Sequence, residues 1–285
     1  MRRYHLLPIL CLLGAVICAT MSSASATVVI KTFPGPKGSS SAFITISGDI
    51  DSTTLKEFSE AVASPVVKQS HFTSVYLDSP GGSVLDAMAI GEIIRTNGYS
   101  TIVMYPGPCA SACVLILASG VIRECVGKVA IHRPHFDEKV FAQLSQTEAQ
   151  AKYAQMGDAV RQYLSRMGMP DTLYTAMLRV SSDDVQYLSE EEIVAYGLEG
   201  EDPAWSEWHR AQMIQSMGVE KYAYQKSRGA IMSACLKTTS DTQKCISDVW
   251  REFDDTVKSC SSYSGDKYVA CVNVIEKNMI QKYTE

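Results

Sequence analysis

The chain has 285 residues, of which 46% are hydrophobic and 20% charged, and its formal net charge is −5. This length can bury a full core and fits one domain with an appended segment. An acidic chain without basic runs argues against nucleic-acid binding, and nothing after the first residues approaches the ~20 apolar residues of a membrane-spanning helix.

The N-terminal segment, residues 1–26, has the features of a cleavable signal peptide. Two arginines give a positive start, residues 6–20 are almost wholly apolar, and residues 24–26 form a small-residue cleavage site. A retained anchor is the weaker interpretation because the run is short, and a lipoprotein attached at Cys18 is disfavoured by the bulky residue before it. We therefore expect a mature protein that starts near Thr27 and is periplasmic or secreted. Its net charge becomes −7 when the two arginines are lost.

Strand and helix patterns alternate through residues 27–202. The expected strands are 27–33, 42–47, 72–77, 100–104 and 126–131. The expected helices are 55–62, 84–96 and 110–119, followed by 144–167 and by helices that begin at Pro170 and Ser189. Because short connections join strands to helices, the pattern predicts an α/β domain with a parallel sheet and helices outside it.

Residues 203–285 predict a small helical region of three helices that carries four cysteines. An exported protein meets an oxidising compartment, so these cysteines are expected to form disulfides. The favoured pairs are Cys235 with Cys245 and Cys260 with Cys271, each clamping a turn between helices. The nested pairing, 235–271 with 245–260, stays open. A zinc site is the weaker interpretation, because the spacing lacks the close ligand pairs of most zinc sites.

Three further cysteines, Cys109, Cys113 and Cys125, lie in the α/β region. At most two of them can pair with each other. The first two lie one helical turn apart, so their sulfur atoms face the same way. We therefore expect one of them to bridge to Cys125 and anchor the helix. One thiol is then left over.

Two short motifs and one histidine carry the chemistry. The segment 78–83 ends a strand in Gly81-Gly82, whose N–H groups have no Cβ to block an approaching anion. Ser111 lies among small residues at the head of an apolar helix, where unpaired N–H groups favour negative charge. His132 follows the next strand, and a neutral imidazole can take the proton of a serine near pH 7. This order of oxyanion loop, nucleophile and base predicts an acyl-transfer site.

Together these residues resemble the Clp protease proteolytic subunit and its periplasmic relatives. The resemblance rests on residues 44–50, 76–82, 110–112, 130–134 and 187–198. Over roughly residues 40–200 it implies the Clp/crotonase fold, in which repeated ββα units stack as a spiral and the chains usually form oligomers. It also implies Ser111 as nucleophile, His132 as general base, and oxyanion N–H groups from Gly82 and Ala112.

The third member of a Ser–His–Asp triad is less well defined by the sequence. Where the resemblance calls for an Asp, two residues before an aromatic-Leu-Ser motif, this chain has Val185. Asp184 is our candidate for orienting the imidazole of His132, although a shift of one residue in an extended segment reverses side-chain direction. A Ser–His dyad and an inactive relative stay open. His135 and Asp137 are interpreted as surface-loop residues.

The sequence therefore predicts an exported serine peptidase that cleaves peptides or unfolded proteins through an acyl-enzyme. The alternative is a catalytically inactive scaffold or binding protein with the same fold. Acyl-CoA chemistry is disfavoured for an exported protein, and a Ser–Lys mechanism is unsupported because no lysine lies in residues 78–119. We expect a homo-oligomer with no cofactor and no metal. An ATPase partner is not expected, because ATP is not available outside the inner membrane.

Overall fold

The computed structural model describes residues 27–35, 39–135, 141–238 and 241–284, so the expected signal peptide lies outside the described residues. The chain divides into two compact units, and the division falls between Gly200 and Glu201. Within the described ranges no helix has both the length and the apolar character needed to cross a membrane.

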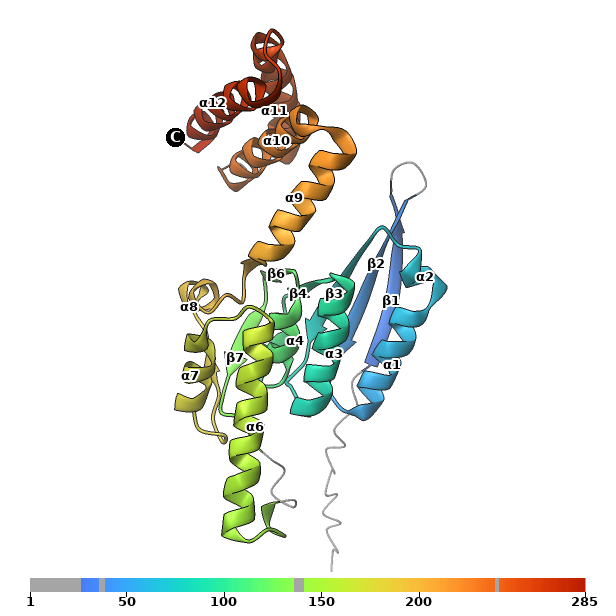
Figure 1. Ribbon diagram of the computed structural model, residues 1–285, viewed down its shortest axis with the longest axis vertical. Helices are drawn as coiled ribbons and strands as arrows, with labels where there is room; N and C mark the ends of the chain where they lie inside the picture. Colours follow the sequence, from blue (N-terminus) through green and yellow to red (C-terminus); the bar gives the residue numbers. More distant parts are fainter. Residues whose placement is uncertain (1–26, 36–38, 136–140, 239–240, 285) are drawn as a thin grey trace, which may run out of the picture. The chain divides into compact units, whose positions relative to one another are not determined.

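The first unit is built around two β-sheets (Figure 1). The strands are β1 (Thr27–Pro34), β2 (Ser40–Ser47), β3 (Phe72–Asp78), β4 (Ser100–Val103), β5 (Pro108–Ala110), β6 (Ile122–Cys125), β7 (Lys128–Ile131), β8 (Gln186–Tyr187) and β9 (Gly200–Glu201). One sheet has the order β1-β2-β3-β4-β6-β9 and the other has the order β5-β7-β8. The pairs β2–β3, β3–β4, β4–β6 and β5–β7 are parallel. β1 is antiparallel to β2, because the short link between them cannot make the crossover that parallel strands need.

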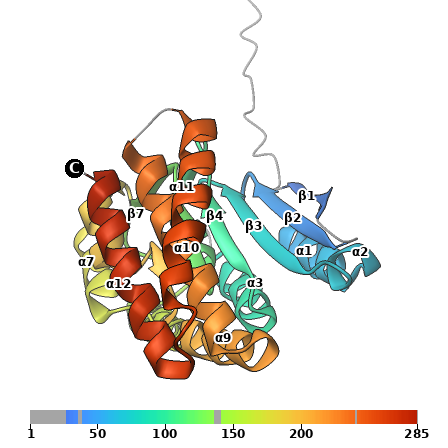
Figure 2. The ribbon, with the colours of Figure 1, turned by 90° about the horizontal axis from the view of Figure 1, so that it is seen from above.

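Helices cover one face of the larger sheet, and α1 and α3 lie side by side there (Figures 1 and 2). The helices of this unit are α1 (Ser52–Ala63), α2 (Pro65–Lys68), α3 (Val84–Asn97), α4 (Cys113–Ser119), α6 (Gln146–Arg166), α7 (Asp171–Arg179) and α8 (Glu190–Ala195). Side-chain caps fix several of their starts. Asp51 accepts from the Thr54 N–H at α1, and Ser189 and Glu192 form a capping box at the expected start of α8. The α/β architecture expected from the sequence is confirmed.

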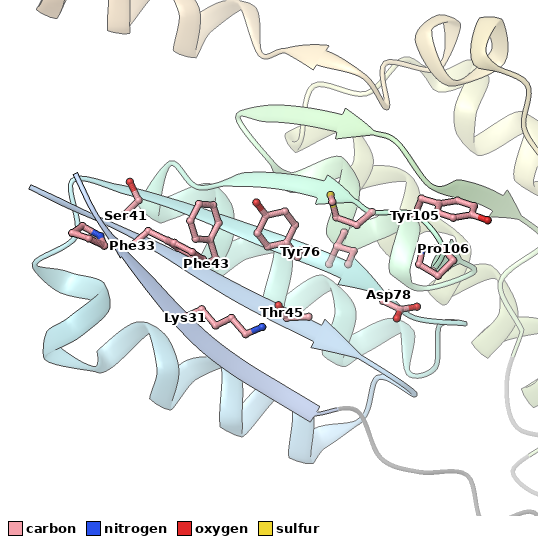
Figure 3. Close-up of a pocket in the computed structure, with 13 residues that line it drawn as sticks. Lys31, Phe33, Ser41, Phe43, Thr45, Tyr76, Asp78, Tyr105 and Pro106 are labelled. Atoms are coloured by element: carbon pink, nitrogen blue, oxygen red, sulfur yellow. The ribbon is translucent and has the colours of Figure 1, made fainter. Parts of the chain in front are cut away.

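The two faces of the larger sheet differ in character. Ile44 and Ile46 of β2 are fully buried toward the helices, and the alternate residue Phe43 points to the opposite face. On that opposite face a pocket of about 540 Å³ is lined by aromatic and apolar side chains, among them Phe43, Tyr76 and Tyr105 (Figure 3).

Two local predictions in this unit are wrong. The helix expected over 110–119 begins only at Cys113, because β5 and a tight turn precede it. The strand β6 was missed because the charged Arg123 hides its pattern. In the fold Arg123 is buried, and its guanidinium donates to the carbonyl groups of Gly120 and Gly197, both at 2.7 Å.

The second unit is helical. Its described residues form α9 (Pro203–Met217), α10 (Val219–Thr238), α11 (Thr242–Val257), a 3₁₀ turn (Lys258–Cys260) and α12 (Gly265–Thr284). This makes four α-helices in the described part where three were expected, because Gly218, with a φ of 85°, separates α9 from α10. Buried residues of α10, α11 and α12, such as Ile231, Phe253 and Val272, form its own core.

Two disulfides join the helices of the second unit. Cys235 pairs with Cys245 across the α10–α11 turn, and Cys260 pairs with Cys271 between the 3₁₀ turn and α12. This is the favoured pairing rather than the nested one. The four sulfur atoms are therefore used in bridges, and the weaker zinc interpretation is dropped.

Candidate active site

The loop that follows β3 is shaped by two glycines. Gly81 and Gly82 have φ angles of 113° and 138°, a region that residues with a Cβ rarely adopt. A Cβ on Gly81 would lie 2.6 Å from the Cβ of Ser111, and a Cβ on Gly82 would collide with the backbone of Ile50. Only glycine therefore lets this loop run so close to Ser111 on one side and to Ile50 on the other.

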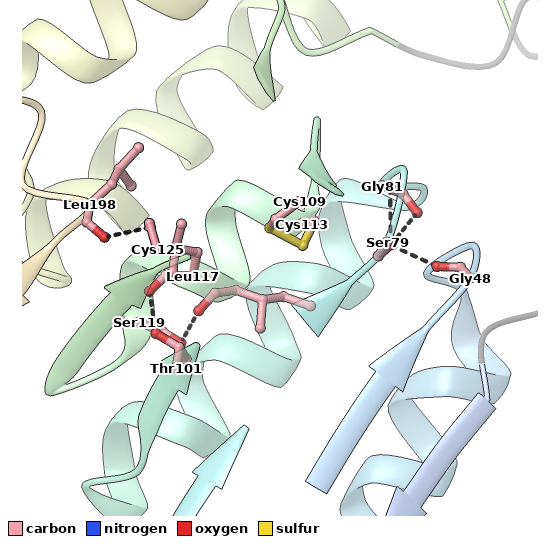
Figure 4. The surroundings of a disulfide bond; sticks show 11 residues. Gly48, Ser79, Gly81, Thr101, Cys109, Cys113, Leu117, Ser119, Cys125 and Leu198 are labelled. Atoms are coloured by element: carbon pink, nitrogen blue, oxygen red, sulfur yellow. Dashed lines mark hydrogen bonds between the residues drawn. A yellow bond between two sulfur atoms is a disulfide. The ribbon is translucent and has the colours of Figure 1, made fainter. Parts of the chain in front are cut away.

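Ser79 ties the glycine loop to its surroundings (Figure 4). Its hydroxyl donates to the Gly48 carbonyl at 2.6 Å and accepts the Gly81 N–H at 3.1 Å. The Ile50 N–H donates to the Gly81 carbonyl at 2.7 Å. These bonds leave the N–H of Gly82 without an acceptor anywhere in the described ranges, and Gly82 is exposed. A rigid loop with one free, exposed N–H can bind an oxyanion.

Ser111 occupies a strained turn between β5 and α4. Its φ is 56°, and it is the one non-glycine residue with a positive φ in the part of the chain that the structure describes. Such a conformation costs ~1–2 kcal/mol for a residue with a Cβ. The Ser111 N–H donates to the Ala130 carbonyl at 3.1 Å. The N–H of the following residue, Ala112, has no acceptor among the described residues. A half-buried hydroxyl therefore stands beside two free N–H groups, those of Gly82 and Ala112.

A disulfide spans this turn. Cys109 in β5 is bonded to Cys113, the first residue of α4, with their Cα atoms 5.3 Å apart (Figure 4). The expectation of a bridge to Cys125 is wrong. It assumed one continuous helix through both cysteines, whereas the turn at Ser111 brings the two sulfur atoms together. Cys125 is free and half-buried, and its thiol donates to the Leu198 carbonyl at 3.4 Å. Burial raises its pKa to about 12, so this thiol is a poor nucleophile.

His132 follows β7, which lies next to β5 in the smaller sheet. The two strands are parallel, with Ala110 paired to Ala130, so Ser111 and His132 both leave the sheet at the same edge. His132 is only 7% exposed. Burial and, less strongly, the neighbouring His135 lower the pKa of its imidazole. The side chain is therefore neutral near pH 7 and able to accept a proton.

The imidazole of His132 has no carboxylate partner among the residues that the structure describes. Its Nδ1 atom is buried and makes no hydrogen bond to any described residue, and no acidic group contributes to its pKa shift. β8 is antiparallel to β7, with Ala130 paired to Tyr187 and Ile131 to Gln186, and the ladder ends there. Beyond it the Arg133 N–H donates to the Val180 carbonyl at 3.1 Å.

Asp184, the candidate third residue, is exposed, and its carboxylate accepts the N–H of Val185 at 2.8 Å. In the described chain it makes no hydrogen bond to His132, and it is not among the groups that shift the pKa of that imidazole. His135 is exposed, and the centroid of its ring lies 5.4 Å from that of His132. Asp137 lies outside the described residues.

The structure thus brings Gly82, Ser111, Ala112 and His132 to one edge, and within the described chain Asp184 makes no hydrogen bond to His132. Over the described ranges, the Ser111 hydroxyl makes no hydrogen bond, so the proton path from Ser111 to His132 is not closed in this conformation. Two supports of the site, the Ser79 hydroxyl and the Cys109–Cys113 bridge, were not predicted from the sequence. A serine between a strand and Pro-Gly-Gly is a signal for a local side-chain-to-backbone bond.

Comparisons with known proteins agree with the resemblance read from the motifs. The family model described as Clp protease matches residues 39–201, a range that includes all four of the residues gathered at this edge. The ATP-dependent Clp protease proteolytic subunit of Pleurastrum terricola is 30% identical over 129 residues. That alignment covers 44% of this chain and 63% of the algal protein, so this chain spans less than two thirds of that relative.

Proposed function

Because this chain belongs to the Clp protease family, we propose that it is an exported serine peptidase that uses Ser111 and His132. The observation that carries the proposal is the strained turn of Ser111 beside the glycine loop. Backbone strain in a residue with a Cβ persists only where the surroundings impose it, and it gathers at functional sites. No other non-glycine residue of the described chain has such a φ.

The reaction is acyl transfer to Ser111. The Ser111 oxygen attacks the carbonyl carbon of a peptide bond while His132 takes the hydroxyl proton. The carbonyl oxygen becomes an oxyanion and is stabilised by the free N–H groups of Gly82 and Ala112. When the intermediate collapses, the C–N bond breaks and the imidazolium returns the proton to the leaving amine. Water, deprotonated by the same imidazole, then hydrolyses the acyl ester and restores Ser111.

A Ser–His dyad is the form of this mechanism that fits the residues. Nothing acidic in the described chain faces Nδ1 of His132, so the imidazolium formed during attack lacks the stabilisation that a triad supplies. The enzyme is therefore slow by the standard of peptidases with a full triad. The Ser111 hydroxyl and the imidazole must also approach each other when a substrate binds.

Export is supported by the cysteines. Six of the seven cysteines that follow residue 26 are in disulfides, which persist in oxidising compartments. We place the mature chain in the periplasm or outside the cell. No ATP is available there, so the substrates are short or unfolded peptides that need no ATP-driven unfolding. A homo-oligomer is proposed on the family resemblance.

A second candidate function is a catalytically inactive scaffold or binding protein. Val185 in place of the expected Asp and the open path between Ser111 and His132 favour it. In that case the glycine loop and the turn are retained as an anion-binding or structural feature, and no acyl-enzyme forms.

A fluorophosphonate probe separates the two candidates, because it reacts with an activated serine. The oxidised wild type should become labelled, with the label mapped to the peptide that contains Ser111, and Ser111→Ala should abolish it. His132→Ala should slow labelling by a factor of ~10³ or more. Ser182→Ala, which alters a serine on the turn before β8, is the control and should label like the wild type. Absence of label on folded wild type at any probe concentration refutes the peptidase and leaves the scaffold.

A further inference from the structure

The Cys109–Cys113 disulfide closes a ring whose middle residue is Ser111. Both cysteines are fully buried, and the bridge joins the middle residue of β5 to the first residue of α4. The Cα atoms are 5.3 Å apart, whereas four extended residues would span about 13 Å. The bridge therefore excludes every extended conformation of residues 109–113.

We propose that this disulfide is a positioning element for the nucleophile: it holds Ser111 in its left-handed conformation and so sets the rate of acylation. The inference rests on the proposed peptidase function. Its physical basis is that a serine relaxes out of a positive φ unless its neighbours prevent it. The bridge opposes that relaxation directly, because it fixes the distance between the two residues that flank the turn.

The same bridge also sets the position of one oxyanion donor, the N–H of Ala112. Ala112, whose N–H is free in the described chain, lies inside the ring next to Ser111. Gly81 lies so close to the turn that a Cβ on it would be 2.6 Å from the Ser111 Cβ. Any relaxation of the ring therefore moves the nucleophile and one oxyanion donor together, relative to a glycine loop that Ser79 keeps in place.

The rest of α4 does not depend on the bridge. Val114 to Ala118 are fully buried, and two side chains from other elements hold carbonyl groups of the helix. The Tyr163 hydroxyl donates to the Leu115 carbonyl and the Thr101 hydroxyl donates to the Leu117 carbonyl, both at 2.8 Å. Loss of the bridge should therefore loosen residues 109–113 while the helix and the domain stay folded.

The test is the double variant Cys109→Ala/Cys113→Ala, compared with Cys235→Ala/Cys245→Ala, which removes a bridge of the second unit. Fluorophosphonate labelling is measured over a range of probe concentrations, so that the limiting rate and the apparent affinity are separated. We expect the first variant to lose about 10- to 100-fold in the limiting rate with the apparent affinity nearly unchanged, since a displacement of ~1 Å costs about 10² in rate. The control variant should keep the wild-type rate.

A second readout does not need activity. The three-bond coupling between the amide and α protons of Ser111, with its amide exchange rate, reports on its φ and on the stability of the turn. Removal of the bridge should change the coupling and speed the exchange. If the double variant does not fold, reduction of the intact protein and its reoxidation replace it, and the labelling rate must fall and return.

The outcomes separate the two claims. A wild-type labelling rate together with an unchanged Ser111 coupling in the bridge variant overturns the positioning role. A wild type that never labels, but whose Ser111 turn loosens when the bridge is removed, refutes the peptidase and leaves the structural role of the bridge intact.

Discussion

A carboxylate at position 185 should complete the site. Val185 precedes Gln186 of β8, and His132 follows Ile131, the residue of β7 that is paired with Gln186, so we expect the side chains of Val185 and His132 to be neighbours. The Nδ1 atom of His132 has no partner among the described residues. In Val185→Asp, the new carboxylate can accept the Nδ1 proton and stabilise the imidazolium that forms during attack.

The size of the effect follows from distance and exposure. Opposed Cβ atoms lie ~5 Å apart, and an opposite charge at that range shifts a pKa by ~1–3 units. Because Val185 is 46% exposed, water screens the new charge, and we expect the lower end of that range. The pKa of His132 should rise by ~1 unit, or about 1.4 kcal/mol. The acylation rate should rise by roughly tenfold, well below the ~10⁴-fold effect of a buried triad aspartate.

Two measurements check this prediction. A pH titration of the His132 ring resonances, identified by their loss in His132→Gln, gives the pKa. Fluorophosphonate labelling gives the rate. Val185→Asn keeps the shape of the new side chain without its charge, so it should leave the pKa close to the wild-type value. An unchanged His132 pKa in Val185→Asp would refute the reasoning, because it would mean that position 185 does not face the imidazole.

Three further predictions concern the same site and the core. The wild-type kcat/KM should reach half of its plateau below pH 6.5, because burial lowers the pKa of His132 from that value and only the neutral imidazole accepts the proton; a midpoint above about pH 7 contradicts this. Ser79→Ala removes the hydrogen bonds of the hydroxyl to Gly48 and Gly81 and should lower kcat by roughly tenfold with little change in KM, whereas Ser182→Ala should alter neither. Tyr163→Phe should reduce the free energy of unfolding by about 1 kcal/mol in urea, because the hydroxyl donates to the buried Leu115 carbonyl. Equal stability would mean that this bond adds nothing beyond ring packing.

Much of the fold could be predicted because it depends on local patterns. The alternation of buried and exposed residues in β2 and the capping sequence at Ser189 are visible in the chain itself. β6 was missed because its buried Arg123 finds its hydrogen-bond partners only in the folded protein, at Gly120 and at the distant Gly197. The sequence alone does not show which groups will bind a charged side chain inside a strand, so it does not predict a strand there.

The cysteines show the same division. The bridges of the second unit link residues 10 and 11 positions apart across turns that the sequence marks. The Cys109–Cys113 bridge could not be read in this way, because the spacing of four suggested a helix. It joins the two residues that flank the turn at Ser111, and the positive φ of that turn is not marked by any local sequence pattern.

By itself the sequence determined which residue types are available for catalysis: a serine among small residues, a glycine pair and a histidine, each at the end of a strand. Their meeting at one edge was decided by tertiary structure, because parallel pairing of β5 with β7 aligns segments that lie about twenty residues apart. The pairing of β7 with β8 includes only Tyr187 and Gln186 of β8, so Asp184 lies outside the ladder and accepts the N–H of its own neighbour, Val185. Side-chain direction in a strand depends on register, and register is fixed only when the strands meet.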